Sequence, residues 1–264
     1  QKCYNLAMYI VIIAIFGLIV GSLLNVIIFR LKSGDKIVWA RSKCLHCGHQ
    51  LSAADLVPIL SYVFLRAKCR YCHKKIDWQY PAVEGVTAVI FVLGYLKFLS
   101  PVLTVANLPA YLIFLFFSGV LLVIFVYDLK YYLILDEVTL PAWLFAFLAN
   151  WLLGFSIFNL LLASLVLAGF FLFQFILSKG KWIGGGDIRL GLVMGAMLGW
   201  PMVLVALLLS YITGAAVSLG LLVFKQKSWG DQIPFGTFLT LATVVVLLYG
   251  EVILRWYLTK AHLL

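Results

Sequence analysis

Residues 106–127 read ANLPAYLIFLFFSGVLLVIFVY, and Asp128 follows this stretch directly. None of these 22 residues carries a charge. As a helix, ~20 apolar residues cross the ~30 Å hydrocarbon core of a bilayer. A helix also satisfies its backbone polar groups within one segment, whereas a strand would need a closed barrel. The stretch therefore predicts a transmembrane helix with a carboxylate at one end.

The rest of the chain repeats this apolar pattern. Of its 264 residues, 64% are hydrophobic and only 11% are charged, which would leave a soluble domain with far too much exposed apolar surface. We therefore predict an all-α polytopic membrane protein with about eight transmembrane helices. The expected spans are 7–29, 82–98, 106–127, 138–155, 157–178, 188–200, 202–224 and 237–256.

The first span occupies the position of a secretory signal. Its apolar stretch is too long for the h-region of a signal peptide, little positive charge precedes it, and further spans follow. We expect a permanent first transmembrane helix at 1–29 and a polar loop domain at 30–81. The remainder, 82–264, is expected to be a membrane-embedded domain of about seven helices.

The distribution of positive charge predicts the orientation, because Lys and Arg favour the cytosolic side of a membrane protein. One predicted face carries sixteen of the twenty Lys and Arg residues, ten of them in the loop 30–81. We therefore expect the loop in the cytosol and both termini on the outer side. This bias and attraction to anionic lipid account for the net charge of +10, so the expected partner is the lipid bilayer and not nucleic acid.

Two cysteine pairs lie in the polar loop. Residues 44–47 read Cys-Leu-His-Cys and residues 69–72 read Cys-Arg-Tyr-Cys, with 21 residues between the pairs, one more than is usual for such zinc sites. Two such turns can complete a tetrahedral four-thiolate site, which favours Zn²⁺ and leaves iron as an alternative. We predict a structural zinc ion that folds the loop and takes no part in catalysis, held by Cys44, Cys47, Cys69 and Cys72.

Other roles for these cysteines are less well supported. Disulfide bonds would form only in an oxidising compartment, and a cytosolic loop keeps its thiols reduced. His46, His49 and His73 lie beside the pairs as alternative ligands. Each pair already supplies two sulfur atoms, however, so we expect these histidines to be ordinary loop residues.

Two carboxylates lie where an apolar span meets the predicted cytosolic face. Asp128 follows the span 106–127, and Asp187 follows Gly184-Gly185-Gly186 at the start of the span 188–200. An acidic residue beside the hydrocarbon core of a membrane is a candidate functional residue. Two facing carboxylates can share a proton, so that one acts as base on a water while the other polarises a carbonyl. The glycines would let a backbone or an extended substrate approach closely.

A structural role is the simpler alternative for both aspartates. Asp187 could cap the helix that it begins. Asp128 could form an ion pair with Lys130 or Arg189 at the membrane interface. On the physics of the residues alone, catalysis at these positions is therefore one hypothesis among several.

Three further acidic residues lie at the starts of spans. Asp136 and Glu137 are rivals for the catalytic pair, but they precede the span 138–155, where Asp suits an N-cap and Glu the first turn of a helix. Glu84 could likewise cap the span 82–98, and it lies close to the proposed site face. We therefore keep Glu84 as a possible further site residue.

A series of short motifs runs through the chain in a fixed order. They are Gly21-Ser22-Leu23-Leu24-Asn25-Val26, Arg30-Leu31, the first cysteine pair with Gly48-His49, Pro58-Ile59-Leu60-Ser61-Tyr62, the second cysteine pair, Tyr80-Pro81-Ala82-Val83-Glu84, Asp128, Gly184-Gly185-Gly186-Asp187 and Ile233-Pro234-Phe235-Gly236. By these motifs the chain resembles the type IV prepilin peptidases, the bifunctional leader peptidases and N-methyltransferases of pilus, type II secretion and competence systems. In this resemblance Asp128 matches the first catalytic aspartate and Asp187 the second, which follows the signature glycines Gly184 and Gly186.

The chain also departs from the family pattern. Leu135 stands where Pro usually precedes Asp136, Leu23-Leu24 replaces Phe-Leu, and Ile183, Arg189 and Thr237 stand where Met, Lys and Pro are common. None of these changes removes a carboxylate or a cysteine. The resemblance therefore still implies activity and leaves substrate preference open.

The resemblance implies a membrane-embedded aspartic peptidase of the bacterial inner membrane. Asp128 and Asp187 would activate water at the cytosolic edge and cut the basic leader from a prepilin or pseudopilin just before its hydrophobic helix, typically after Gly. A second implied activity methylates the new N-terminal amine with S-adenosylmethionine. The sequence contains no glycine-rich loop of the dinucleotide-binding type, so motif patterns do not locate the binding site of the methyl donor. The resemblance points to the cysteine loop and its junction with the first two spans.

Two other classes of function compete with this interpretation. A presenilin-like or preflagellin-like peptidase would share the paired aspartates without methyl transfer, but the cysteine loop counts against it. A transporter or zinc-binding membrane scaffold would use Asp128 and Asp187 to carry protons or ions. Transporters are typically built from paired halves with helices broken at mid-membrane, and this sequence has no matching halves.

Overall fold

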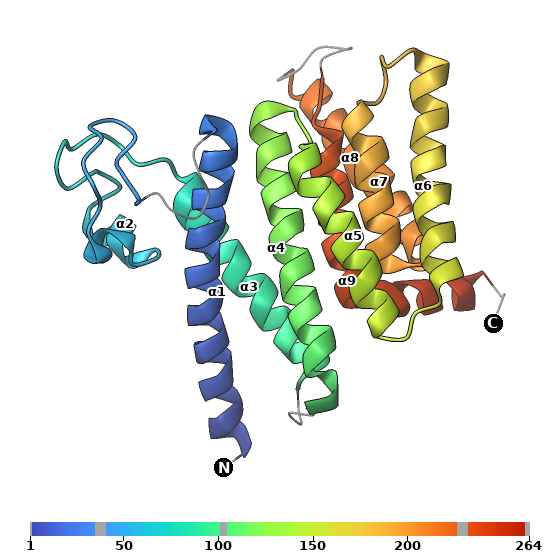
Figure 1. Cartoon of the computed structure of the whole chain (residues 1–264), viewed down its shortest axis with the longest axis horizontal. Helices are drawn as coiled ribbons and strands as arrows, with labels where there is room; N and C mark the ends of the chain where they lie inside the picture. The colour runs from blue at the N-terminus through green and yellow to red at the C-terminus, as the bar shows by residue number, and fades with distance from the viewer. Residues whose placement is uncertain (1, 35–40, 101–104, 226–231, 262–264) are drawn as a thin grey trace. The chain divides into compact units, whose positions relative to one another are not determined.

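The computed structural model describes residues 2–34, 41–100, 105–225 and 232–261. Across these ranges the chain forms helices and no strand, with two isolated β-bridges in the cysteine loop. Figure 1 shows the order of the helices. Their bounds are α1 (Lys2–Ser33), η1 (Ala53–Leu56), α2 (Leu60–Phe64), α3 (Gln79–Phe98), η2 (Val105–Asn107), α4 (Leu108–Tyr131), α5 (Asp136–Leu152), α6 (Ile157–Ser178), α7 (Gly185–Leu198), α8 (Met202–Val223) and α9 (Phe235–Lys260), where η marks a short 3-10 helix.

The expected all-α polytopic architecture is confirmed. Each predicted span coincides with one long helix, and the differences are confined to the ends. Within the described ranges, six helices are long and apolar enough to cross a membrane: α1, α3, α4, α6, α8 and α9. The other two, α5 and α7, have 17 and 14 residues. A count of about eight spans therefore stays a prediction for those two helices.

The chain divides into two compact units, residues 1–119 and residues 120–264, with the division inside α4. In the first unit, α1 packs along α3. A Cβ atom added to Gly21 would lie 2.6 Å from the Cα atom of Glu84, so the two backbones touch at this point. Small residues permit such close approach between membrane helices. Asn25 strengthens the contact by donating a hydrogen bond to the Tyr80 carbonyl at 3.0 Å.

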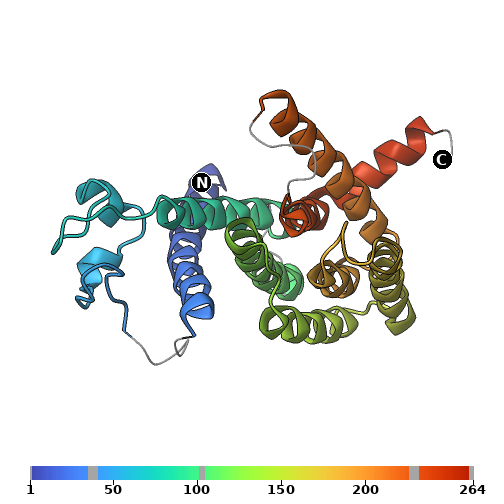
Figure 2. The ribbon, with the colours of Figure 1, turned by 90° about the horizontal axis from the view of Figure 1, so that it is seen from above.

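In the second unit, α5, α6 and α9 all pack against α7, as Figure 2 shows in the view from above. The α7 side chains are almost completely buried from Leu190 to Leu198. Asn150 of α5 donates to the carbonyl oxygens of Ala196 and Met197 at 2.7 and 3.0 Å, and Ser164 of α6 donates to the Leu192 carbonyl at 3.1 Å. The short helix α7 is thus held inside the unit by its neighbours.

Candidate active site and metal centre

The Asp128 carboxylate lies in the last turn of α4 and is 5% exposed. The backbone N–H of Thr237 donates to its Oδ2 atom at 2.9 Å, and the N–H of Gly236 also donates to it. Both donors belong to the first turn of α9, where helix N–H groups have no partner within the helix. A helix N-terminus also favours a negative charge. The start of α9 therefore fixes the orientation of this carboxylate.

Gly236 is required for this contact. A Cβ atom at this position would lie 2.8 Å from the Asp128 Oδ2 atom and 2.8 Å from the Ile134 Cδ1 atom. The motif Ile233-Pro234-Phe235-Gly236 was visible in the sequence, but its connection to Asp128 was not. Only the fold brings residues 109 positions apart into one hydrogen bond.

Asp187 lies in the first turn of α7 and is 6% exposed. Its Oδ2 atom accepts a hydrogen bond from the Gly184 N–H at 3.1 Å. Gly184 is the N-cap of α7, so Asp187 does not take the N-cap position that the sequence suggested and instead accepts this hydrogen bond from within the first turn. The bond uses one oxygen atom of the carboxylate and leaves the other available.

The two aspartates belong to one site in the second unit, where Asp187 lies within electrostatic reach of Asp128. The Ile134 side chain lies against both Gly186 and Gly236, the glycines next to the two aspartates. It would lie 2.8 Å from a Cβ atom added to Gly186, beside Asp187, and it also contacts Gly236. Two buried carboxylates within electrostatic reach of each other disfavour the state in which both are ionised, which suits acid–base activation of a water molecule.

Arg189 pairs with Asp136 rather than with Asp128. Asp136 is the first residue of α5, and Leu135 is the N-cap, so Asp136 does not act as the N-cap that the sequence suggested. Glu137 lies in the first turn, as expected. The Arg189–Asp136 ion pair joins the starts of α5 and α7 and leaves Asp128 with its backbone donors.

An aromatic group near Asp187 was not predicted. Tyr211 of α8 lies within electrostatic reach of Asp187, and its hydroxyl donates to the Gln174 side chain of α6 at 3.1 Å. The Tyr211 ring lies 5.0 Å from the Phe235 ring, which in turn lies 6.2 Å from Phe171. In the sequence these residues look like any other apolar positions of membrane helices.

The four predicted cysteine ligands come together in the first unit. The Sγ atoms of Cys44, Cys47, Cys69 and Cys72 all lie within 4.8 Å of one another, and Cys44 and Cys72 are 3.9 Å apart. A tetrahedral zinc ion with Zn–S bonds of ≈ 2.3 Å places its sulfurs about 3.8 Å apart. All four thiols are free rather than disulfide-bonded. The cluster therefore fits a tetrahedral metal ion.

The two cysteine turns have the same backbone geometry. Gly48 donates to the Cys44 carbonyl at 2.9 Å, and His73 donates to the Cys69 carbonyl at 3.0 Å. Both donors have positive φ angles, 70° at Gly48 and 58° at His73. Burial alone would raise the pKa of the Cys44 thiol, but hydrogen bonds from the backbones of Cys47 and His46 lower it to about 7. A hydrogen bond from the Lys74 backbone favours the Cys72 thiolate, but burial and the neighbouring cysteines raise the pKa of that thiol to about 11.

The histidines next to the cysteines have other environments. The His49 ring stacks on Tyr71 with 3.7 Å between ring centroids. The group of close metal-ligating atoms found among the described residues contains cysteines and no histidine. We therefore keep the four sulfur atoms as the candidate ligands.

An ion pair that the sequence did not reveal braces this loop. The Arg70 Nε atom donates to Asp55 Oδ1 at 2.6 Å, and the Tyr71 hydroxyl donates to Oδ2 at 3.2 Å. Burial alone would raise the pKa of Asp55, but hydrogen bonds from Arg70 and Ser52 lower it to about 2. The contact ties η1 to the second cysteine turn.

Glu84 lies in the first unit, in the second turn of α3, where it is 6% exposed. Its Oε2 atom accepts a hydrogen bond from the Ile59 N–H at 2.8 Å, and the Ser22 side chain also donates to it. Because α3 begins at Gln79, Glu84 does not cap that helix. It instead anchors the cysteine loop to α1 and α3.

Comparison with known proteins agrees with these motifs. Residues 15–98 match the bacterial peptidase A24 N-terminal domain, and residues 115–219 match the type IV leader peptidase family. The chain is similar to a prepilin leader peptidase/N-methyltransferase of Aeromonas hydrophila, with 32% identity over 96% of this chain and 95% of that protein. It is also similar to the protein of that name from Bacillus subtilis (30% identity; 95% and 98% covered). No solved structure matches the chain.

Proposed function

Because this chain belongs to the type IV leader peptidase family, we propose that it is a bifunctional enzyme that cleaves the leader of prepilins or pseudopilins and then methylates the new N-terminus. It is a multi-pass protein of the bacterial inner membrane. The paired buried carboxylates support the first activity, because Asp128 and Asp187 approach each other from different helices. Relatives that carry both activities in their name support the second.

In this proposal Asp128 and Asp187 form the catalytic pair. One carboxylate takes a proton from a water molecule, which attacks the carbonyl carbon of the scissile peptide bond. The other carboxylate, still protonated, donates a hydrogen bond to the carbonyl oxygen as negative charge develops there. The C–N bond then breaks as the carbonyl re-forms, and the proton taken from water passes to the leaving amine nitrogen. The backbone N–H groups of Thr237 and Gly236 hold Asp128 in place, and the Gly184 N–H holds Asp187.

The cysteine cluster is proposed to hold a structural Zn²⁺ ion. Four thiolates close the coordination sphere, so no position remains for water or substrate. The ion would fold the loop by joining two turns that are 21 residues apart in the chain.

The methyl donor is proposed to be S-adenosylmethionine. The amine nitrogen of the new N-terminus would bond to the donor's methyl carbon while the electron pair of the broken C–S bond returns to sulfur and the nitrogen releases a proton. A peptidase without methyl transfer is disfavoured because the chain has the tetra-cysteine loop. A transporter or scaffold is disfavoured because the chain is similar over nearly its whole length to enzymes.

We place the cysteine loop and both aspartates on the cytosolic side, and both termini on the outer side. The concentration of Lys and Arg on the connections of one face supports this orientation. A prepilin leader would meet the carboxylates on the same side on which it is synthesised.

Mass spectrometry of a prepilin incubated with the purified protein tests the proposal. Wild type is expected to release the leader and leave a product heavier by one methyl group when donor is present. Asp128→Asn and Asp187→Asn are expected to leave the prepilin intact. Glu251→Gln, an exposed change near the other end of α9, is the control and should cleave like wild type. Cleavage at the wild-type rate by either Asn variant would disprove the catalytic pair.

A further inference from the structure

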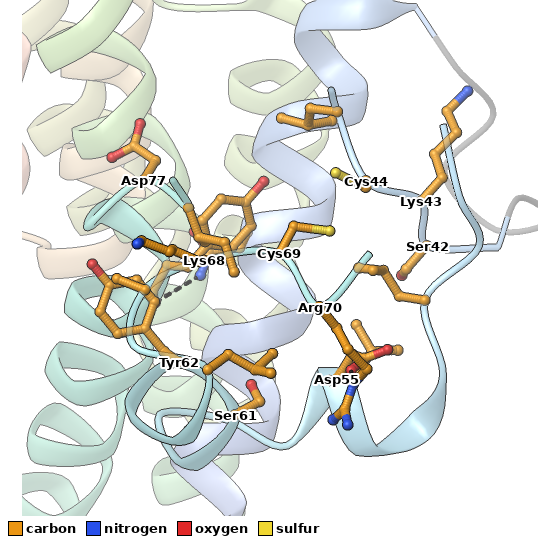
Figure 3. A pocket seen from close by; sticks show the side chains of 18 of the residues that line it. Ser42, Lys43, Cys44, Asp55, Ser61, Tyr62, Lys68, Cys69, Arg70 and Asp77 are labelled. Atoms are coloured by element: carbon orange, nitrogen blue, oxygen red, sulfur yellow. Dashed lines mark hydrogen bonds and ion pairs between the residues drawn. The ribbon is translucent and has the colours of Figure 1, made fainter. Parts of the chain in front are cut away.

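Each unit of the molecule has an ion pair that joins two different segments. In the first unit, Asp55 and Arg70 lie side by side (Figure 3) at a cavity of about 820 Å³ that Glu84 also lines. In the second unit, Asp136 at the start of α5 pairs with Arg189 near the start of α7. The second pair therefore belongs to the unit that holds both aspartates.

Residues 132–136 form a short strap that leads from the end of α4 to the start of α5. The strap begins beside Asp128, because the Tyr132 N–H donates to the Asp128 carbonyl oxygen at 2.8 Å. Tyr132 has a φ angle of 56°, so the chain leaves the helix at this residue. The strap ends at Asp136, whose partner Arg189 lies in the helix that carries the second aspartate. Its two ends are thus tied to the two helices that bear the carboxylates.

The middle of the strap lies between two glycine backbones. A Cβ atom added to Gly186 would lie 2.8 Å from the Cβ atom of Ile134, and one added to Gly236 would lie 2.8 Å from its Cδ1 atom. The two glycines thus meet opposite ends of one side chain. Gly186 precedes Asp187, and the Gly236 N–H donates to Asp128. The length of the Ile134 side chain therefore sets the spacing between the backbones next to the two carboxylates.

Ile134 can act as a spacer only if its own backbone is held in place. Branching at Cβ already restricts the χ1 angle of the side chain. The Asp136–Arg189 pair supplies a fixed point two residues further along the strap. Both ionised side chains are about half exposed, 47% for Asp136 and 44% for Arg189, and such a pair contributes little to overall stability. We therefore expect it to affect the position of Ile134 more than the folding of the unit.

We propose that Ile134, Asp136 and Arg189 are positioning residues for the peptidase reaction. Asp136 and Arg189 fasten the strap, and Ile134 keeps the two catalytic carboxylates at the separation that water activation requires. Misplacement of a catalytic group slows the chemical step, so the strap acts on kcat and not on substrate affinity. The proposal rests on the assignment of Asp128 and Asp187 as the catalytic pair.

Prepilin cleavage by the purified full-length protein tests the ion pair. Asp136→Asn and Arg189→Gln should each lower kcat about tenfold and leave KM unchanged. The double variant should be no slower than the slower single variant, because both changes remove the same interaction. Arg189→Lys keeps the positive charge and should cleave at close to the wild-type rate.

Glu137→Gln is the matched control for the ion pair. Glu137 is exposed, lies in the same first turn of α5 and loses the same charge in this variant. It should cleave like wild type. The melting temperatures of Asp136→Asn, Arg189→Gln and Glu137→Gln should all match that of wild type, because exposed ion pairs contribute little to stability.

Ile134→Ala tests the spacer. Alanine keeps the Cβ atom that faces Gly186 and removes the Cδ1 atom that faces Gly236. The expected result is a fall in kcat of about tenfold or more, again without a change in KM. Leu133→Ala is the control at the neighbouring position, because Leu133 is 56% exposed, and it should cleave like wild type.

Hydrogen exchange of the backbone reports on the strap without reference to cleavage. Loss of the fastening contact should let the strap open locally, so Arg189→Gln should speed exchange across residues 132–139 about tenfold. Glu137→Gln should leave this exchange unchanged. Unchanged exchange in Arg189→Gln would overturn the role given to the ion pair.

The outcomes separate this inference from the proposed peptidase. If wild type cleaves prepilin and Asp136→Asn and Arg189→Gln keep its kcat, the strap has no positioning role. A raised KM with an unchanged kcat also overturns the inference, because the two side chains would then contact the substrate. A loss of kcat that follows a lowered melting temperature overturns it in favour of a structural role. A wild-type protein that cleaves no prepilin contradicts the peptidase, and faster exchange in Arg189→Gln would still support the fastening of the strap.

Discussion

At the scale of single residues, the site depends on groups that carry no reactive chemistry of their own. Asp128 is positioned by the backbone of Gly236 and Thr237, and Ile134 fills the space between Gly186 and Gly236. The sequence motifs identified both aspartates as candidates. They did not identify these contacts, because hydrogen bonds from backbone N–H groups depend on the fold and not on residue type.

Gly236→Ala tests this dependence. The added Cβ atom would lie 2.8 Å from the Asp128 Oδ2 atom, so either the carboxylate or the start of α9 must move. We expect cleavage to fall about 100-fold, because misplacement of a catalytic group by ~1 Å costs on that order. The measurement is the prepilin cleavage rate of purified protein.

Gly220→Ala is the control for this change. A Cβ atom at Gly220, within α8, meets nothing within 4 Å, and Ala favours a helix over Gly by about 1 kcal/mol. Its cleavage rate should match that of wild type. A Gly236→Ala variant as active as Gly220→Ala would contradict the role given to Gly236.

At the scale of elements, the long helices could be predicted and the loop between α1 and α3 only in part. Apolar runs of membrane length determine where α6 and α8 begin and end, so their bounds follow from composition. The spacing of the cysteines predicted one metal cluster, and their sulfur atoms do meet. The α2 helix, the Asp55–Arg70 pair and the Glu84–Ile59 contact were not predicted, because each depends on tertiary contacts in an irregular segment.

Removal of the metal tests the proposed function of the loop. We expect one zinc ion per chain by elemental analysis, and loss of that ion in Cys47→Ser. Because the ion joins the two cysteine turns, its loss should increase hydrogen exchange of the backbone across residues 41–78 while exchange within α6 and α7 stays unchanged.

His49→Ala is the control for Cys47→Ser in the measurement of zinc content. The His49 ring packs on Tyr71, and the candidate ligand set consists of four sulfur atoms, so this variant should retain a full complement of zinc. Loss of zinc in His49→Ala, or full zinc content in Cys47→Ser, would show that the ligand assignment is wrong.

At the scale of the whole molecule, two compact units carry different chemistry. The first contains the cysteine cluster and the cavity beside Glu84, and the second contains both aspartates. The sequence predicted a division into a first helix, a loop domain at 30–81 and a membrane domain at 82–264, and that division stays a prediction. In the structure the loop, α1 and α3 belong to the same unit, because Glu84 and Asn25 tie them together.

Reporter fusions test the proposed orientation of the molecule. Alkaline phosphatase is active only outside the cytosol, so we expect activity when it is fused to the C-terminus and none when it is inserted into the loop 30–81. The physical reason is the excess of Lys and Arg on one predicted face. Activity of the loop insertion would reverse the proposed topology and put the aspartates on the wrong side for a cytosolic leader.

The central claim is that Asp128 and Asp187 act as one catalytic unit, and a double-mutant cycle on the cleavage rate tests it most directly. We predict that Asp128→Asn and Asp187→Asn each slow prepilin cleavage about a thousandfold or more, because each removes one member of a unit that needs both carboxylates. The effects of residues that act as a unit are strongly non-additive, so the double variant should be no slower than the slower single variant. Losses that multiply in the double variant, or a single variant that cleaves at the wild-type rate, would contradict the claim.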